Sequence, residues 1–175
     1  MDIFPYATTG HTLDFIPDDR QPQFSNVGVM YGGLLNDELY SSIFGLFLYQ
    51  NEQLSLQQKL FEGYERVDHS SVVLPADSQR IGYILIWGGI TPAGNHSSEL
   101  FQIDLPLLSD EPNSIENVDI SAITQSGDIP PGRSGHTAVY YNGNMVIFGG
   151  RDESNIYSTI YTFDVECLFY FSSKI

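Results

Sequence analysis

The chain has 175 residues, of which 42% are hydrophobic and 13% aromatic, so it is long and apolar enough for one globular domain with a buried core. Its net charge of -15 argues against binding to nucleic acid or to a membrane surface through charge. The single Cys167 excludes a disulfide within the chain, and the sequence shows no secretion signal and no apolar run of the length a membrane span needs. We therefore expect a cytoplasmic protein whose partners are neither nucleic acid nor membrane.

Three segments of the chain contain the same features in the same order: a histidine, two apolar runs and a pair of glycines. Each begins near a histidine, passes through apolar and β-branched residues, and reaches a pair of glycines at the end of a second apolar run. In chain order these landmarks are His11 with Gly32-Gly33, His69 with Gly88-Gly89, and His136 with Gly149-Gly150. Three copies of the same order indicate a structural repeat.

Each copy has the pattern of a small antiparallel sheet. In the third copy, HTAVYY and NMVIF are joined by Asn142-Gly143, a strong hairpin signal because both positions tolerate positive φ. The runs are too short for helices, and their nearly continuous apolar character predicts burial on both faces of the sheet. A polar loop follows each glycine pair, and then a third strand that ends at Asp104 or Asp164 in the second and third copies.

This order resembles the kelch repeat, whose units are four-stranded blades of a β-propeller. The third copy carries Arg133, Gly135 and His136 at its opening, whereas the second has Asp68 in place of the small glycine. The first copy departs furthest, with Thr8 in place of the arginine and Phe47 in place of the closing aspartate. The resemblance implies structural roles for the shared positions, which are His11, Gly32, Gly33, His69, Gly88, Gly89, Asp104, His136, Gly149, Gly150 and Asp164.

The resemblance implies an all-β, kelch-type β-propeller of about three four-stranded antiparallel blades. We expect blade units at about residues 5–60, 61–125 and 126–167, with 168–175 as a tail. Because propellers usually close with about 4 to 8 blades, three blades predict an incomplete ring with an apolar face bare at each end. Either the chain is truncated, or it completes its ring with another copy by self-association through the unpaired blade faces.

The resemblance also implies a partner surface, since in kelch domains the loops after the glycine pairs commonly bind other proteins. Those loops are residues 34–38, 91–98 and 151–155. In such domains the arginine of the blade opening sometimes contacts an acidic ligand segment. This suggests a protein partner with an acidic segment, bound by Arg66, Arg133 and Arg151. The alternative is that Arg66 and Arg133 pair with groups inside the ring.

Some kelch-like propellers catalyse, so an enzyme or carbohydrate-binding protein of the galactose-oxidase kind is the alternative function. Galactose oxidase uses copper with histidines, tyrosines and a Cys–Tyr crosslink. Here Cys167 is the only thiol, and the histidines of the repeat stand one per unit instead of at metal-ligand spacing. The Glu-x3-Asp-x3-His set of the iron-using specifier proteins and the Gly-x-Ser-x-Gly turn are also absent from the sequence. We therefore expect a non-catalytic protein-interaction scaffold without cofactor or metal.

Overall fold

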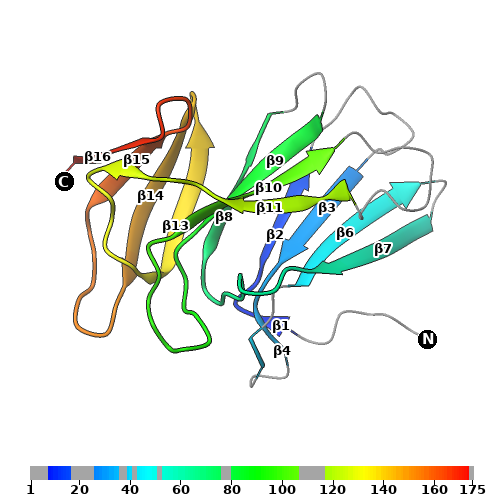
Figure 1. Ribbon diagram of the computed structural model, residues 1–175, viewed down its shortest axis with the longest axis horizontal. Helices are drawn as coiled ribbons and strands as arrows, with labels where there is room; N and C mark the ends of the chain where they lie inside the picture. The colour runs from blue at the N-terminus through cyan, green and yellow to red at the C-terminus, as the bar shows by residue number, and fades with distance from the viewer. Residues whose placement is uncertain are drawn as a thin grey trace.

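The structure is a computed structural model that describes residues 8–16, 26–35, 39–40, 43–50, 53–75, 80–106 and 117–173. Three antiparallel sheets stand side by side and fan out from their first strands without closing into a ring (Figure 1). These first strands, β2 (Thr12–Ile16), β8 (Ser70–Leu74) and β13 (Ser134–Tyr141), are neighbours in that order. This arrangement agrees with the prediction of about three antiparallel blades in an unclosed ring. The part of the chain that the structure describes holds no helix long and apolar enough to cross a membrane.

Each blade continues outward from its first strand. The first blade adds β3 (Asn26–Tyr31), β6 (Ile43–Gln50) and β7 (Gln53–Leu60). The second adds β9 (Arg80–Trp87), β10 (Leu100–Pro106) and β11 (Asp119–Ala122), and the third adds β14 (Asn144–Arg151), β15 (Ile160–Asp164) and β16 (Phe169–Ser173). A separate small sheet below the first blade contains β1 (Thr8–Thr9), β4 (Leu34–Leu35) and β5 (Leu39–Tyr40).

The third blade includes residues that the sequence analysis placed in a tail. Phe169–Ser173 form β16, which pairs antiparallel with β15, so these residues of the predicted tail 168–175 belong to the blade. The chain reverses because the Asp164 carboxylate accepts hydrogen bonds from the backbone N–H groups of Glu166 (3.0 Å) and Cys167 (2.8 Å). The strand β12 (Ser126–Gly127) pairs parallel with β16 and gives this sheet a fifth strand.

Two apolar cores fill the spaces between the blades. Alternate residues of β9 point in opposite directions, so that Ile84 and Ile86 pack toward the first blade while Leu85 and Trp87 pack toward the third. All four side chains are buried. This arrangement explains the continuous apolar run of β9, since both faces of the middle blade are covered.

Histidines connect the second blade to the first and the third blade to the second. The Nε2 atom of His69 lies 3.1 Å from the Thr12 hydroxyl, and that of His136 lies 2.7 Å from the Ser70 hydroxyl. The His136 ring also stands edge-on to Trp87 at 4.8 Å between centroids. Burial lowers the pKa of His69 to about 3 and that of His136 to about 4, so both rings are neutral at physiological pH.

The glycine pairs leave room for these histidines. A Cβ on Gly88 would lie 2.7 Å from His136 Cε1, and one on Gly32 would lie 2.8 Å from His69 Cε1. Both glycines also have φ near +70°, a conformation that residues with a Cβ rarely adopt. The spacing of histidines and glycines in the repeat therefore reflects contact between neighbouring blades.

Candidate functional site between two blade loops

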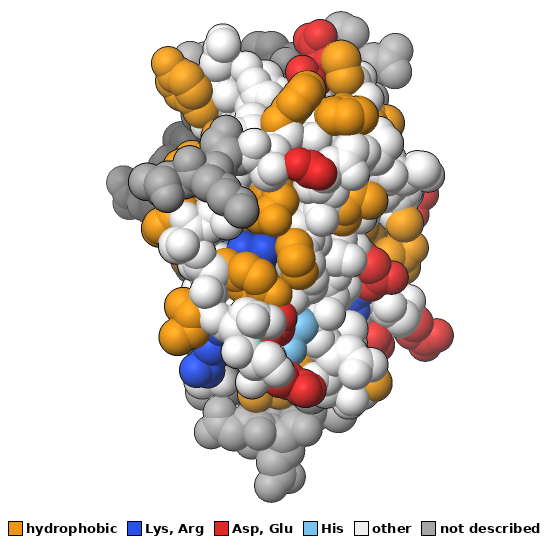
Figure 2. All heavy atoms as spheres, turned by 90° about the vertical axis from the view of Figure 1, so that its left-hand side faces the viewer, with side chains coloured by type: hydrophobic (Ala, Val, Ile, Leu, Met, Phe, Trp, Pro, Cys, Tyr) orange, Lys and Arg blue, Asp and Glu red, His pale blue; other side chains and the backbone are white. Residues whose placement is uncertain are grey.

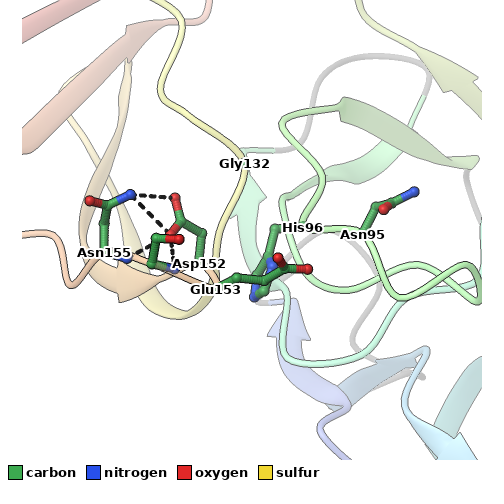
Figure 3. Close-up of a pocket in the computed structure, with 7 residues that line it drawn as sticks. Asn95, His96, Gly132, Asp152, Glu153 and Asn155 are labelled. Atoms are coloured by element: carbon green, nitrogen blue, oxygen red, sulfur yellow. Dashed lines mark hydrogen bonds between the residues drawn. The ribbon is translucent and has the colours of Figure 1, made fainter.

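A hollow of about 350 Å³ lies between the loops that follow the second and third glycine pairs. Figure 3 shows the residues that line it, which are Asn95, His96, Gly132, Asp152, Glu153, Ser154 and Asn155. The loops 91–98 and 151–155 thus converge, as their equivalent positions in the repeat predict. Of the third expected loop, residues 36–38 lie outside the described part of the chain.

Backbone hydrogen bonds close both loops on themselves. The N–H of Thr91 donates to the carbonyl of Asn95 and the N–H of Asp152 donates to that of Asn155, each at 3.0 Å. Loops closed in this way, on strands packed into two cores, hold the polar lining of the hollow in place without a partner.

The Asp152 carboxylate holds the loop 151–155 in its conformation through hydrogen bonds. Its Oδ1 atom accepts hydrogen bonds from the backbone N–H groups of Ser154 and Asn155, both at 2.7 Å. The Tyr157 hydroxyl donates to the same carboxylate, and this bond, followed by those from Ser154 and Asn155, holds the pKa of Asp152 below its ordinary value. Asp152 therefore stays ionised, and the neighbouring Glu153 is exposed at the rim of the hollow.

Gly132 brings the third blade close to the loop of the second. A Cβ at this position would lie 2.2 Å from the carbonyl oxygen of His96, and the next residue, Arg133, donates its N–H to the carbonyl of Ser97 at 3.3 Å. The backbone of one blade therefore runs against that of the other at the floor of the site, and only glycine fits between them.

Replacing Gly132 with alanine is expected to destabilise the fold by about 1 to 3 kcal/mol, because the backbone carbonyl of His96 cannot move aside as a flexible side chain could. Urea unfolding followed by tryptophan fluorescence would measure the change. Ser121→Ala, at an exposed position on β11, is the control and should stay within about 0.5 kcal/mol of the native chain. Equal stability of Gly132→Ala and the native chain would contradict this account of the contact.

Arg66 and Arg133 lie in the interior and not on the loop surface where the sequence analysis placed them. The two residues are 4% and 0% exposed. Arg66 forms an ion pair with Glu99 and donates from Nη1 to the carbonyl of Glu65 at 2.8 Å. The alternative that these arginines pair with groups inside the ring agrees with this geometry.

The hydrogen bonds of the Arg133 side chain and its shortest ring contacts are made within its own blade. Its Nε donates to the carbonyl of Pro131 and its Nη1 to that of Gly149, both at 3.1 Å. The guanidinium carbon lies 3.7 Å from the centroid of the Tyr157 ring and 5.2 Å from that of Tyr161. The equivalent Arg66 lies over Phe101, so in the second and third blades the aromatic residue of the third strand stacks with the arginine of the same blade.

Arg151, the remaining predicted contact residue, is exposed at the end of β14. The lining of the hollow itself carries Asp152 and Glu153, which the sequence analysis did not single out. Their only signal in the sequence was their place in a polar loop after a glycine pair. The charge at this site is therefore mainly negative.

Within the residues that the structure describes, no group of three or more His, Cys, Asp or Glu side chains is placed to hold a metal ion. His69 and His136 instead contact hydroxyl groups of neighbouring blades. His96 is the histidine that lines the hollow.

Two solved structures share this fold at low sequence identity. One is described as the cryo-EM structure of RAG in complex with one melted RSS and one unmelted RSS, with a TM-score of 0.63 and 17% identity over 97% of this chain. The other is the structure of YjhT, with a TM-score of 0.61 and 12% identity over 97% of this chain. The chain spans 52% of the length of each, about half. Comparison with curated proteins gives no significant match.

The family itself is identified from the sequence. Residues 22–170 match the family described as the KLHDC2/KLHL20/DRC7 Kelch-repeats domain. The match takes in all of the second blade and most of the first and third, including His69, His136 and the three glycine pairs. The chain therefore belongs to the Kelch-repeat family.

Proposed function

We propose that this chain is a non-catalytic protein-interaction module of the cytoplasm that binds its partner at the hollow between the second and third blades. Kelch domains generally mediate protein–protein interaction. The observation that carries the proposal is the convergence of two self-closed loops, which place amide, imidazole and carboxylate groups around one hollow. A polar site held by rigid strands suits recognition of an exposed polar segment of another protein.

The charge of the site favours a basic segment of the partner. Asp152 and Glu153 offer carboxylates at the hollow, whereas the guanidinium groups of Arg66 and Arg133 are turned inward. The acidic segment expected from the sequence depended on Arg66, Arg133 and Arg151, and of these only Arg151 is exposed. The net charge of -15 adds a long-range attraction for Lys and Arg side chains and disfavours nucleic acid.

Replacing Glu153 with lysine is expected to weaken binding of a basic peptide by about tenfold, because it reverses a charge at the rim of the site. Fluorescence anisotropy with labelled peptides, one carrying Lys and Arg between Gly and Ser residues and one carrying Asp and Glu instead, would measure it. The native chain should prefer the basic peptide, and the preference should shrink as salt is raised.

The matched control is Glu62→Lys, which makes the same change of charge at an exposed residue outside the lining of the hollow. If both variants weaken binding equally, the attraction belongs to the overall charge and the proposed site is wrong. Tighter binding of the acidic peptide would also contradict the proposal.

A further inference from the structure

We propose that a second copy of this chain docks its first blade on the outward face of the third blade, so that two copies complete one ring. This interface is separate from the loop site proposed above. It is inferred from contacts that the chain already makes twice, between its first and second blades and between its second and third.

The outward face of the third blade is equivalent, in the repeat, to the face of the second blade that packs against the third blade, but no other described blade of this chain covers it. In the second blade, Val72 and Trp87 are buried against the third blade. The residues at the same places in the third blade, counted from the histidine and the glycine pair, are Val139 and Phe148, and these are 57% and 42% exposed. Figure 2 views the molecule from this side, and hydrophobic side chains are spread over the face.

This face also carries the groups that receive a histidine at the other two interfaces. His136 is held by the Ser70 hydroxyl, by the Trp87 ring and by the space over Gly88. His69 is held in the same way by the Thr12 hydroxyl, by the Tyr31 ring and by the space over Gly32.

The third blade has Thr137, Phe148 and Gly149 at these three places. Thr137 is exposed, and no described atom lies within 4 Å of the point where a Cβ of Gly149 would stand. The third blade is thus shaped to receive a histidine that belongs to the opening of another blade.

The first blade of this chain presents such an opening. Gly10, Asp68 and Gly135, which each precede the histidine of their blade, share φ values of +67°, +55° and +62°. The N–H of Asp68 donates to the carbonyl of Gly10 at 2.9 Å, and that of Gly135 donates to the carbonyl of Asp68 at 3.0 Å. The next bond of this series would join Gly10 of a second copy to the carbonyl of Gly135.

Apolar side chains beside this opening are exposed, although their equivalents in the other blades pack between blades. Leu13 and Phe15 of the first blade are 52% and 67% exposed. The residues at the place of Phe15 in the other blades are Val73 and Tyr140, which pack against the two cores between blades. The first and third blades therefore expose complementary halves of one type of interface.

A second copy is the occupant that closes the ring. Two copies together supply a number of blades within the range of about 4 to 8 in which propellers close. The two junctions would be identical, each joining the third blade of one copy to the first blade of the other, which gives a closed dimer with two-fold symmetry. The chain also spans 52% of each of the two solved structures described above, so two copies have about the length of one such chain.

The decisive experiment is crosslinking between two single-cysteine variants of the full chain, His11→Cys and Thr137→Cys, each in a Cys167→Ser background. With a short bismaleimide, a mixture of the two should give a crosslinked dimer, while either variant alone should remain uncrosslinked. Crosslinking of Thr137→Cys with itself, or of neither variant in the mixture, would overturn the proposal.

Sedimentation velocity provides a second test. The native chain should be a dimer, and Phe148→Asp should weaken dimerisation at least about thirtyfold, as expected for the centre of an apolar interface. The control is Ile129→Glu, an equally exposed apolar residue in the connection between β12 and β13. A native chain that stays monomeric and melts sharply, or a control that weakens dimerisation as much, would overturn the interface. Loss of peptide binding at the loop site would not affect this result.

Discussion

Replacing Arg133 with alanine is expected to lower the free energy of unfolding by about 3 to 5 kcal/mol. The side chain is fully buried, donates to the carbonyls of Pro131 and Gly149, and stacks on Tyr157. The substitution removes this packing and leaves the carbonyl groups of Pro131 and Gly149 without these donors. Urea unfolding monitored by the fluorescence of Trp87, which lies 5.9 Å from the guanidinium, would measure the change.

The matched control is Arg151→Ala, which removes the same side chain from an exposed position on the adjoining loop. It should change stability by no more than about 0.5 kcal/mol. If Arg133→Ala left the unfolding free energy unchanged but abolished binding of a peptide, the structural role assigned to Arg133 would be wrong and the role in partner binding would stand.

Lowering the pH from 7 to 5 is expected to cost about 4 kcal/mol of stability through His69 and His136 together. Burial lowers their pKa values to about 3 and 4, from an ordinary 6.5. Between these limits the unfolded chain binds more protons than the folded chain, so stability falls as the pH drops through 6.5 and levels off below the folded values. Each histidine contributes about 2 kcal/mol at pH 5, which is one and a half pH units below 6.5.

The control separates this effect from the overall charge of the chain, which also changes as the pH approaches the isoelectric point of about 4.2. His136→Gln keeps a side-chain amide near the Ser70 hydroxyl but does not titrate. Its stability should fall by about half as much as that of the native chain between pH 7 and pH 5. Parallel pH profiles for the two proteins would show that His136 is protonated in the folded state.

The repeat could be predicted from the sequence because its landmarks are imposed by backbone geometry. Gly88 must allow both a positive φ and the approach of the His136 ring, so neither residue can vary freely. The fourth strand of the third blade, Phe169–Ser173, was missed because outer strands pair mainly through their backbones and carry no such landmark. Its short aromatic run was indistinguishable from a tail.

The repeat left two places open for Arg66 and Arg133, the loop surface and the inside of the ring. Position in a motif determines where the backbone of Arg133 lies, but the direction of a long side chain depends on what surrounds it, here Tyr157 and Tyr161. Gly132 was missed for a related reason. Its requirement arises from the carbonyl of His96 in another blade, and no pattern of nearby residues reveals that contact.

The sequence by itself determined the class of the fold and the approximate number of blades that this chain forms, because these follow from local hairpin signals and from a repeat present in three copies. Only the tertiary structure decided which groups face solvent. In that structure Arg66 and Arg133 are buried, and Glu153 lies at the rim of the hollow. Thr137, Phe148 and Gly149 lie on a face that no other described blade of this chain covers. Burial depends on residues far apart in the chain that meet only when blades pack together, so a single repeat contains too little information to specify it.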